Sequence, residues 1–437
     1  MDYDITDPQS IADYADGLIG KTLRQAANID GHKLQSVNKG KLGNLVEELY
    51  FKIRPDNLSG LPDFEEAGVE LKTTGVKRLK NGQLRPKERL VLSMISYDAI
   101  VNESWERNSL MAKCQLMLIL FYQYQKGLTA IDRRFLAKKL WEFPVEDLVR
   151  IRKDWQIIAE KVRNGRAHEL SEGDTWYLGA CTKSSNSKKR TSQPNSNVPA
   201  KPRAFSLKPS YVQTILDSTT AHENYIEPSK QDNIEEILLS KTSKYVGRYV
   251  DDLLSELRPK IKTTAKSKKS ILALAMLGHK TRHIPELQKA DIYVKVVTIA
   301  KSGSTSKESM SFPAFKYLEI VDQDWDSSSF SNYIEKRFFF VVFREDESGI
   351  KFIGSKFWTM PYEDRVEAEK VWHKTVELIE RGEVDSLPGS KDSRVAHVRP
   401  HGKNARDTLP APDGNHYPKK SFWLNAKYIK AQVEELI

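Results

Sequence analysis

Cysteine is scarce in this 437-residue sequence, and long hydrophobic runs are missing from it. Cys114 and Cys181 each stand alone, which excludes a CxxC zinc site and a disulfide framework. The longest apolar runs, Leu116 to Tyr122 and Phe338 to Phe343, are far shorter than the ~18 residues that a membrane helix needs. The sequence therefore predicts no transmembrane segment, and carboxylates are the expected ligands of any bound metal.

A secretory signal is also lacking. Met1 to Pro8 contains three aspartates and no basic stretch before an apolar one, so a cytoplasmic location is expected. The chain has 69 Lys+Arg against 59 Asp+Glu, a net charge of +10, which fits a nucleic-acid partner without proving one. With 39% hydrophobic residues it can form packed cores, and its length predicts two or three domains of about 150 residues each.

An internal repeat organises the sequence. Residues 87–110 match residues 307–330 at an offset of 220. Three further pairs follow in the same order: 113–127 with 336–349, 143–156 with 360–373, and 203–216 with 420–433. Chance similarity would not keep both order and spacing, so we expect a tandem duplication, with copies at 1–218 and 236–437 and a polar linker at 219–235.

Each copy is expected to be a mixed α/β fold. Hydrophobic patterning predicts helices at 38–53, 144–163 and 208–216, and strands near 67–74, 89–95 and 116–122. Lys80-Asn81-Gly82 lies between the first two strands and is a strong hairpin signal, so these strands are expected to pair antiparallel. The segment 184–202, rich in Ser, Asn, Pro and basic residues, is predicted to be a mobile loop.

Acidic and basic residues of the first predicted strand form a candidate catalytic site. Asp63 precedes Glu70-Leu71-Lys72, and strand alternation places Glu70 and Lys72 on one face. Two carboxylates can hold a hard cation such as Mg²⁺, while an ammonium can stabilise a pentavalent phosphate or help to deprotonate a water. Alone the pattern is weak, because strand charges of this kind are mostly solvated surface groups.

Longer blocks add a family resemblance. GKLGNLVEELYF at 40–51, followed by LPDF and GVELKTT, resembles the MutH mismatch-repair endonuclease. Together with KERLVL, AHELSEG, RAFSLK and HVRPH, these blocks resemble more closely the Sau-type GATC-cutting type II restriction endonucleases, which contain two MutH-like domains. The resemblance implies a tandem PD-(D/E)xK restriction endonuclease fold. It also implies Mg²⁺-dependent hydrolysis of double-stranded DNA at GATC, 5′ of the guanine, with 5′-phosphate ends.

The same resemblance assigns roles to residues of the first copy. Asp63 and Glu70 match the metal-binding carboxylates, and Lys72 matches the catalytic lysine. Glu47 matches a helical acid that assists the site, and Lys113, placed at the start of the next strand, matches an accessory lysine. The alternatives are a helix-surface acid for Glu47 and a strand-edge charge for Lys113.

A recognition loop is expected at 178–188. There Cys181, Thr182 and Lys183 occupy the positions of an arginine, a proline and a lysine that contact bases in MutH. Lys183 can donate to guanine in the major groove, but Cys181 cannot replace an arginine. Ser206 stands where MutH has a tyrosine that senses adenine methylation, so tolerance of adenine methylation is expected.

Basic residues around these motifs are expected to hold the DNA backbone. Arg203 and Lys208 flank Ser206 and are predicted to contact phosphates, the alternative being a helix cap or a solvated side chain. The predicted hairpin adds six basic residues for the same purpose: Lys77, Arg78, Lys80, Arg85, Lys87 and Arg89.

The second copy is expected to be catalytically inactive. Its alignment sets Glu286 against Asp63 and Lys295 against Lys72, but Tyr293 stands in place of Glu70, so a metal-binding carboxylate is missing. A role in DNA binding or as an allosteric effector is expected instead, through Arg399, His401 and Trp423.

Two alternatives stay open, a strand-nicking repair endonuclease of the MutH type and, from another class, a catalytically inert DNA-binding regulator. A single active site per chain implies either sequential cuts by a monomer or transient pairing of two chains on a palindrome. A cognate DNA methyltransferase is expected only as a genetic partner.

Overall fold

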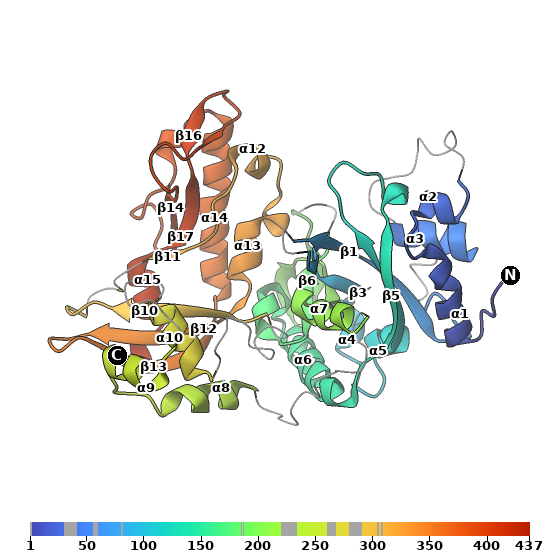
Figure 1. Ribbon diagram of the computed structural model, residues 1–437, viewed down its shortest axis with the longest axis horizontal. Helices are drawn as coiled ribbons and strands as arrows, with labels where there is room; N and C mark the ends of the chain where they lie inside the picture. The colour runs from blue at the N-terminus through green and yellow to red at the C-terminus, as the bar shows by residue number, and fades with distance from the viewer. Residues whose placement is uncertain are drawn as a thin grey trace.

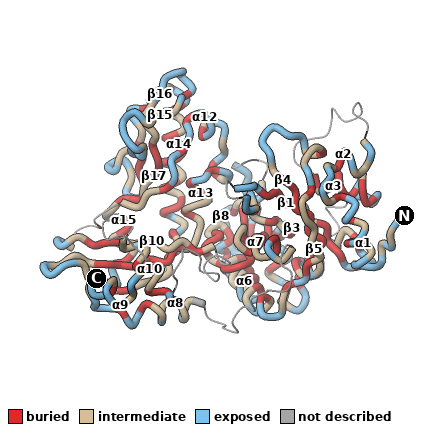
Figure 2. Tube along the Cα trace, in the orientation of Figure 1, coloured by how far each residue is buried: buried red, intermediate tan, exposed pale blue. Residues whose placement is uncertain are grey.

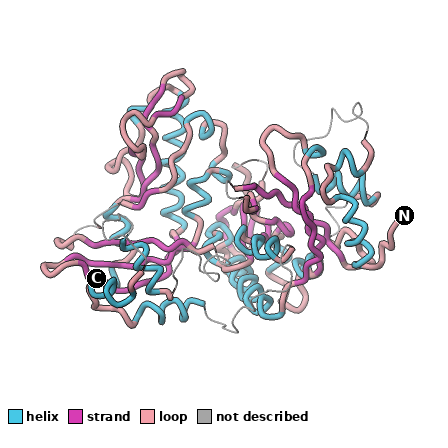
Figure 3. Tube along the Cα trace, in the orientation of Figure 1, coloured by secondary structure: helices cyan, strands magenta, loops and turns pink. Residues whose placement is uncertain are grey.

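The computed structural model describes residues 2–29, 42–55, 60–79, 82–184, 186, 188–219, 234–259, 268–278, 291–303, 306 and 309–437. Figure 1 shows two lobes, one formed by the N-terminal half of the chain and one by the C-terminal half. Strands run through the middle of each lobe and helices surround them (Figure 3), which confirms the mixed α/β class. Within these ranges no helix has both the length and the apolar character needed to cross a membrane.

The central sheet of the N-terminal lobe has the strand order β2-β1-β4-β5. β1 pairs parallel with β4, and β4 pairs antiparallel with β5. Six of the residues of β4 are buried in succession because helices cover both faces, which explains its unbroken apolar sequence; Figure 2 shows this burial along the strands. The strands are β1 (Val69–Arg78), β2 (Leu84–Pro86), β4 (Leu116–Gln123) and β5 (Phe135–Glu142).

Two apolar cores lie on opposite faces of this sheet. One contains Leu118 and Leu120 of β4 and is closed by the N-terminal helices, whereas the other contains Met117 and Ile119 and is closed by α5, α6 and α7. The helices are α1 (Pro8–Tyr14), α2 (Leu23–Ala26), α3 (Leu42–Val46), α4 (Tyr97–Ile100), α5 (Ser109–Cys114), α6 (Val145–Arg163) and α7 (Pro209–Asp217).

The predicted helices at 144–163 and 208–216 are confirmed as α6 and α7. The predicted helix at 38–53 is confirmed from Leu42, since residues 38–41 lie outside the described residues. It changes to a π-helical turn at Glu47–Phe51 and ends at Lys52, whose φ is 59°. Such turns are frequent at functional sites because they rotate the side chains of a helix out of their regular positions.

The predicted pairing of the strands near 67–74 and 89–95 is wrong. β1 turns back onto β2, with Val76 opposite Pro86, whereas β3 (Leu90–Met94) joins a second sheet of order β3-β9-β6. The reason is burial, because Leu90 and Leu92 enter the core beneath that second sheet. Its other strands are β6 (Leu178–Thr182) and β9 (Arg203–Leu207).

Part of the predicted mobile loop at 184–202 is ordered. β7 (Thr191–Gln193) and β8 (Ser196–Ala200) form an antiparallel hairpin, although residues 185 and 187 lie outside the described residues. Gln193 is buried, and its side chain accepts a hydrogen bond of 2.7 Å from the backbone N–H of Ala167. The buried Gln193 amide and the Asn195 side chain, which donates to the Arg163 carbonyl at 2.9 Å, hold this polar segment in place. The composition of the segment did not reveal these contacts.

The C-terminal lobe has sheets of order β10-β12-β13 and β11-β17-β14 and a β15-β16 hairpin. Its strands are β10 (Tyr293–Ile299), β11 (Met310–Ser311), β12 (Arg337–Glu345), β13 (Ile350–Thr359), β14 (Ala396–Pro400), β15 (Thr408–Pro410), β16 (His416–Pro418) and β17 (Lys420–Leu424). Its helices are α8 (Ile234–Ser243), α9 (Val250–Leu257), α10 (Lys268–Met276), α12 (Tyr317–Ile320), α13 (Ser329–Ile334), α14 (Tyr362–Glu380) and α15 (Ala426–Ala431).

The two lobes repeat one arrangement. β10, β12 and β13 pair as β1, β4 and β5 do, parallel and then antiparallel, and α14 has the same 19-residue length as α6. Individual contacts repeat as well. The Tyr211 hydroxyl donates to Asp147 at 2.8 Å, and the Tyr428 hydroxyl donates to Asp364 at 2.8 Å. The tandem duplication predicted from the sequence is therefore present in the fold.

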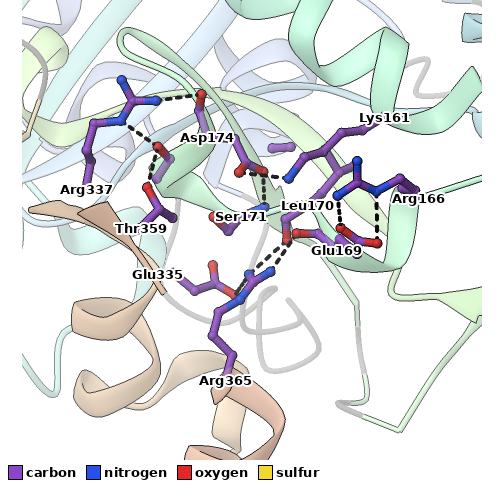
Figure 4. Close-up of polar contacts among 12 residues, drawn as sticks. Lys161, Arg166, Glu169, Leu170, Ser171, Asp174, Glu335, Arg337, Thr359 and Arg365 are labelled. Carbon is purple, nitrogen blue, oxygen red and sulfur yellow. Dashed lines mark hydrogen bonds and ion pairs between the residues drawn. The ribbon is translucent and has the colours of Figure 1, made fainter. Parts of the chain in front are cut away.

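A polar interface joins the lobes (Figure 4). The Arg337 guanidinium donates to the carbonyls of Gly173 and Asp174 at 2.8 and 3.0 Å. Arg365 donates to the carbonyls of Glu169 and Leu170 at 2.6 and 3.1 Å. These contacts hold the segment 169–174 of the N-terminal lobe against β12 and α14 of the other lobe.

Candidate active site

The turn before β1 brings Asp63 next to Glu70. Phe64 and Val69 form an antiparallel bridge, and Gly68 between them has a φ of 67° that favours glycine. The Asp63 carboxylate accepts a hydrogen bond from the Leu71 N–H at 2.9 Å, and the Asp63 N–H donates to Glu70 at 3.1 Å. The local backbone therefore fixes the two carboxylates side by side.

Two lysines converge on Glu70 from different elements. Lys72 Nζ lies 2.6 Å from Glu70 Oε1, on the same face of β1, and Lys113 Nζ lies 3.6 Å from Glu70 Oε2. Lys113 also donates to the Leu61 carbonyl at 2.9 Å. It lies in the last turn of α5 rather than at the start of a strand as predicted, because Asn108 caps a short helix that continues to Cys114.

Burial shifts the pKa values of this cluster. The pKa of Glu47 is raised to about 7 by burial and by the carboxylates of Asp63 and Glu70. Burial also raises the pKa of Glu70. For Lys72 burial opposes the charged form, but Cys114, Glu70 and Asp63 outweigh it and raise its pKa, so its ammonium stays protonated.

The five residues predicted for catalysis are thus brought together, and Glu47 is not a helix-surface acid, since it is only 7% exposed. Asp63 and Glu70 are the groups that could hold a hard cation, because both offer carboxylate oxygens at one point of β1. Among the described residues no group of three or more His, Cys, Asp or Glu side chains has a metal-binding arrangement.

Comparison with known proteins agrees with this geometry. A model of the DNA mismatch repair enzyme MutH matches residues 51–154, which include β1 and its catalytic candidates. The type II restriction enzyme Sau3AI of Staphylococcus aureus is 33% identical to the chain over 98% of its length and 99% of the relative. The chain belongs to the family of this restriction enzyme.

Relatives of the MutH type match less than half of the chain. The DNA mismatch repair protein MutH of Shewanella woodyi is 29% identical over 46% of this chain and 87% of the relative. MutH of Shewanella baltica is 28% identical over 41% of this chain and 79% of the relative. The full-length match to the Sau3AI family, in contrast to these partial matches, agrees with the duplicated fold.

The residues predicted to contact DNA in the N-terminal lobe differ in how far they are exposed. Lys183 is exposed at the end of β6 and Thr182 is half-buried. Ser206 is fully buried in the middle strand of its sheet. Its predicted tolerance of adenine methylation stays a prediction.

The predicted phosphate contacts of Arg203 and Lys208 are wrong for this conformation. Arg203 is 3% exposed, donates to the Ala180 carbonyl and lies 3.8 Å from Glu335 of the other lobe. Lys208 is 2% exposed and donates to the Thr175 carbonyl, and burial lowers its pKa to about 8. Long side chains at these positions satisfy buried carbonyls, a role that a count of basic residues cannot reveal.

The basic residues of the predicted hairpin also differ in exposure. Lys77, Arg78 and Arg85 are exposed, and the exposed Lys87 lies 4.0 Å from the centre of the Tyr124 ring. Lys80 lies outside the described residues. Arg89 does not extend from the hairpin, because it forms an ion pair of 2.9 Å with Glu172.

In the C-terminal lobe the predicted DNA-binding residues share one surface. The Arg399 guanidinium lies 3.7 Å from the centre of the Trp423 ring, and the His401 ring lies 5.1 Å from it. At the position equivalent to the metal site, Lys336 Nζ lies 2.6 Å from Asp291 and 3.3 Å from the Tyr293 hydroxyl. Glu286 lies outside the described residues, so catalytic inactivity of this lobe stays a prediction.

Sequence reasoning missed Asp154 of α6. Its buried carboxylate accepts hydrogen bonds from the N–H groups of Trp176, Tyr177 and Leu178 at 2.9, 2.7 and 3.0 Å. These contacts fix the start of β6, the strand that leads to Lys183. A charged residue next to Trp155 on the apolar face of an amphipathic helix was the signal that could have indicated such an anchor.

Proposed function

We propose that the chain is a type II site-specific deoxyribonuclease that uses Mg²⁺ to hydrolyse both strands of DNA at GATC, 5′ of the guanine, leaving 5′-phosphate ends. The observation that supports it is the cluster of Asp63, Glu70 and Lys72 on β1, in a chain of the Sau3AI family. The carboxylate pair fits Mg²⁺, which prefers oxygen ligands and is commonly bound by one or two carboxylates. Asp63 and Glu70 would hold the ion.

The bound cation would supply the positive charge that activates a water and neutralises the attacked phosphate. Lys72 would stabilise the charge of the pentavalent phosphate, because its raised pKa keeps it protonated at neutral pH. Glu47 can exchange a proton near neutral pH, since its pKa is about 7. Lys113 would orient Glu70, because it holds both that carboxylate and the Leu61 carbonyl.

The proposed domains are a catalytic one at 1–218, a linker at 219–235, and a second one at 236–437 that binds DNA without cutting it. Residues 220–233 of the linker lie outside the described residues. Lys183 and Thr182 of the first domain, and Arg399, His401 and Trp423 of the second, are the proposed DNA contacts. Cytoplasmic location and a methyltransferase as genetic partner complete the proposal.

End mapping tests the proposed activity. The purified chain is incubated with plasmid DNA and Mg²⁺, and all ends are sequenced. We expect ends at GATC on both strands and none with Asp63→Ala, whereas Glu66→Ala, an exposed acid of the same turn, should cut normally. Single-strand nicks alone would favour a MutH-type repair endonuclease, and specific binding without cutting would favour a DNA-binding regulator.

The role proposed for the second domain predicts a dependence on the number of target sites. If Arg399, His401 and Trp423 bind a second GATC sequence, a plasmid with two sites should be cut faster than one with a single site. Replacement of Arg399 by Ala should remove this difference and leave the one-site rate unchanged. Equal rates on both plasmids with the unchanged protein would contradict the effector role.

A further inference from the structure

Strand register shows which residues of the two lobes are equivalent. In the second sheet of the N-terminal lobe Leu178 and Leu207 are opposed, as Ala396 and Leu424 are in the C-terminal lobe. Counting along these strands places Cys181, opposite Ala204, at the position of Arg399, opposite Ser421. The third strand of each sheet follows the same register, so Arg89 before β3 is equivalent to Ser309 before β11.

The two equivalent surfaces carry different side chains. In the C-terminal lobe the Arg399 guanidinium stacks on Trp423 and is exposed. In the N-terminal lobe the small residues Cys181 and Ser206 replace this pair, and both are buried. An arginine is therefore missing from β6, and so is the ring that would support it.

A different arginine, Arg89, lies on the face of the sheet that carries Cys181 and Ser206. Val91, Ser206 and Gly179 are opposed across the three strands, so Arg89, two residues before Val91, shares their face. Its guanidinium donates to the Glu172 carboxylate at 2.9 Å, and Cys181, two residues beyond Gly179, lies on the same face. The Glu172 carboxylate lies only 3.1 Å from the point where a Cβ on Gly179 would be, so this glycine makes room for it.

A second nitrogen of the Arg89 guanidinium, Nη2, binds an oxygen acceptor of the other lobe. Arg89 Nη2 donates to the side-chain oxygen of Asn332 in the C-terminal lobe at 2.8 Å. The side chain of Arg89 is still 23% exposed. An amide oxygen and the O6 atom of guanine are equivalent acceptors, and arginine commonly reads guanine through O6 and N7.

We propose that Arg89 supplies the guanine-reading guanidinium of the catalytic domain, in place of the arginine that β6 lacks, and that Glu172 positions it. On DNA the Asn332 oxygen is exchanged for the guanine edge, while Glu172 keeps its hold. The proposal rests on the proposed function, because it assumes that this face meets the GATC sequence. It makes the two domains read DNA with arginines from neighbouring strands of the same sheet.

Binding without Mg²⁺ tests the proposal separately from cleavage. Affinity is measured for a GATC duplex and for the same duplex with 7-deazaguanine, which lacks the N7 acceptor, in the target. We expect the unchanged protein to prefer the GATC duplex by about 10-fold, within the range of one bidentate arginine contact. Because Arg399 of the second domain is itself proposed to bind GATC, the comparison is made in chains that carry Arg399→Ala. In that background Arg89→Lys keeps the charge and a partner for the buried Glu172, so the fold is retained, yet this preference should be lost.

Two controls sharpen the result. Asn332→Ala removes the acceptor contributed by the other lobe, together with the donor to the carbonyls of Ser327 and Ser328, and its preference should be unchanged. Arg89→Ser combined with Cys181→Arg moves the arginine to the position of Arg399, without the ring that Trp423 supplies in the C-terminal lobe, and should restore the preference in part. Arg89→Lys with full preference, or with equal weakening on GATC and unrelated duplexes as for a phosphate contact, would overturn the proposal. An unchanged protein that binds GATC better than an unrelated duplex but tolerates 7-deazaguanine would overturn this inference alone. One that binds GATC no better than an unrelated duplex would overturn the proposed function, and this inference with it.

Discussion

At the scale of single residues, the candidate active site is a group of buried charges that compensate one another incompletely. The three carboxylates of Glu47, Asp63 and Glu70 face the two ammonium groups of Lys72 and Lys113, so negative charge is in excess when all of them are ionised. Burial, and secondarily the neighbouring carboxylates, raises the pKa of Glu47 and of Glu70. A cation would relieve this excess. Proximity of the acids in the sequence made Asp63, Glu70 and Lys72 predictable, whereas the burial of Glu47 depends on how α3 packs on β1.

The raised pKa of Glu47 predicts a pH-dependent stability of the metal-free protein. Its folded pKa of about 7 exceeds the ordinary value of 4.5, so the folded state binds more protons than the unfolded state between these values, and stability falls as pH rises through this range. In Glu47→Gln this fall should be smaller by about 1–2 kcal/mol, allowing for solvent screening. Urea unfolding between about pH 5 and about pH 8 measures it.

The control for this experiment is Glu48→Gln, an exposed acid in the same turn. It should leave the pH dependence as it is in the unchanged protein. Identical pH profiles for Glu47→Gln and the unchanged protein would show that Glu47 ionises normally.

At the scale of elements, α6 and the second sheet decide how the recognition strand is held. Asp154 of α6 caps three consecutive N–H groups at the start of β6. The pairing of β3 with β9 then closes this sheet over the core. Hydrophobic patterning predicted the strand near 89–95, but the Asn-Gly signal gave it the wrong partner, because the same apolar face could be buried against either sheet.

Removal of the Asp154 carboxylate should loosen the recognition strand. Asp154→Ala leaves buried N–H groups without their acceptor, so we expect the free energy of unfolding to fall by about 3 kcal/mol or more. Denaturant unfolding measures the loss. Lys153→Ala, at an exposed position of the same helix, should change stability by less than about 0.5 kcal/mol, and a comparable loss in both variants would refute the anchoring role.

At the scale of the whole molecule, the lobes are two copies of one fold that apolar and polar contacts hold together. One apolar cluster includes residues of both lobes, such as Trp155 and Phe339, and the arginines of the C-terminal lobe hold the backbone of 169–174. This segment leads directly into β6, so the second lobe is connected to the recognition strand of the first.

The interface predicts that Arg365 protects the segment 169–174. Arg365→Ala leaves the carbonyls of Glu169 and Leu170 without their donor, at a cost of about 2 kcal/mol. Amide hydrogen exchange in 169–174 should become faster, while exchange in β1 of the first lobe stays the same. Lys370→Ala, on the exposed side of α14, is the matched control. Unchanged exchange in Arg365→Ala would show that Arg337 and the apolar contacts hold this segment without Arg365.

The sequence by itself determined the duplication, the α/β class and the catalytic candidates, because each is written in short segments whose residues stay close after folding. Only the tertiary structure decided whether Arg203, Lys208 and Arg89 are exposed or buried, since burial of a basic side chain depends on the partners that lie within its reach. Arg89 and Asn332 are 243 residues apart and meet only when the two lobes pack together. Composition gives the number of basic residues. Only the folded chain determines which of them are solvated, which donate to buried carbonyls and which lie at the interface between the lobes.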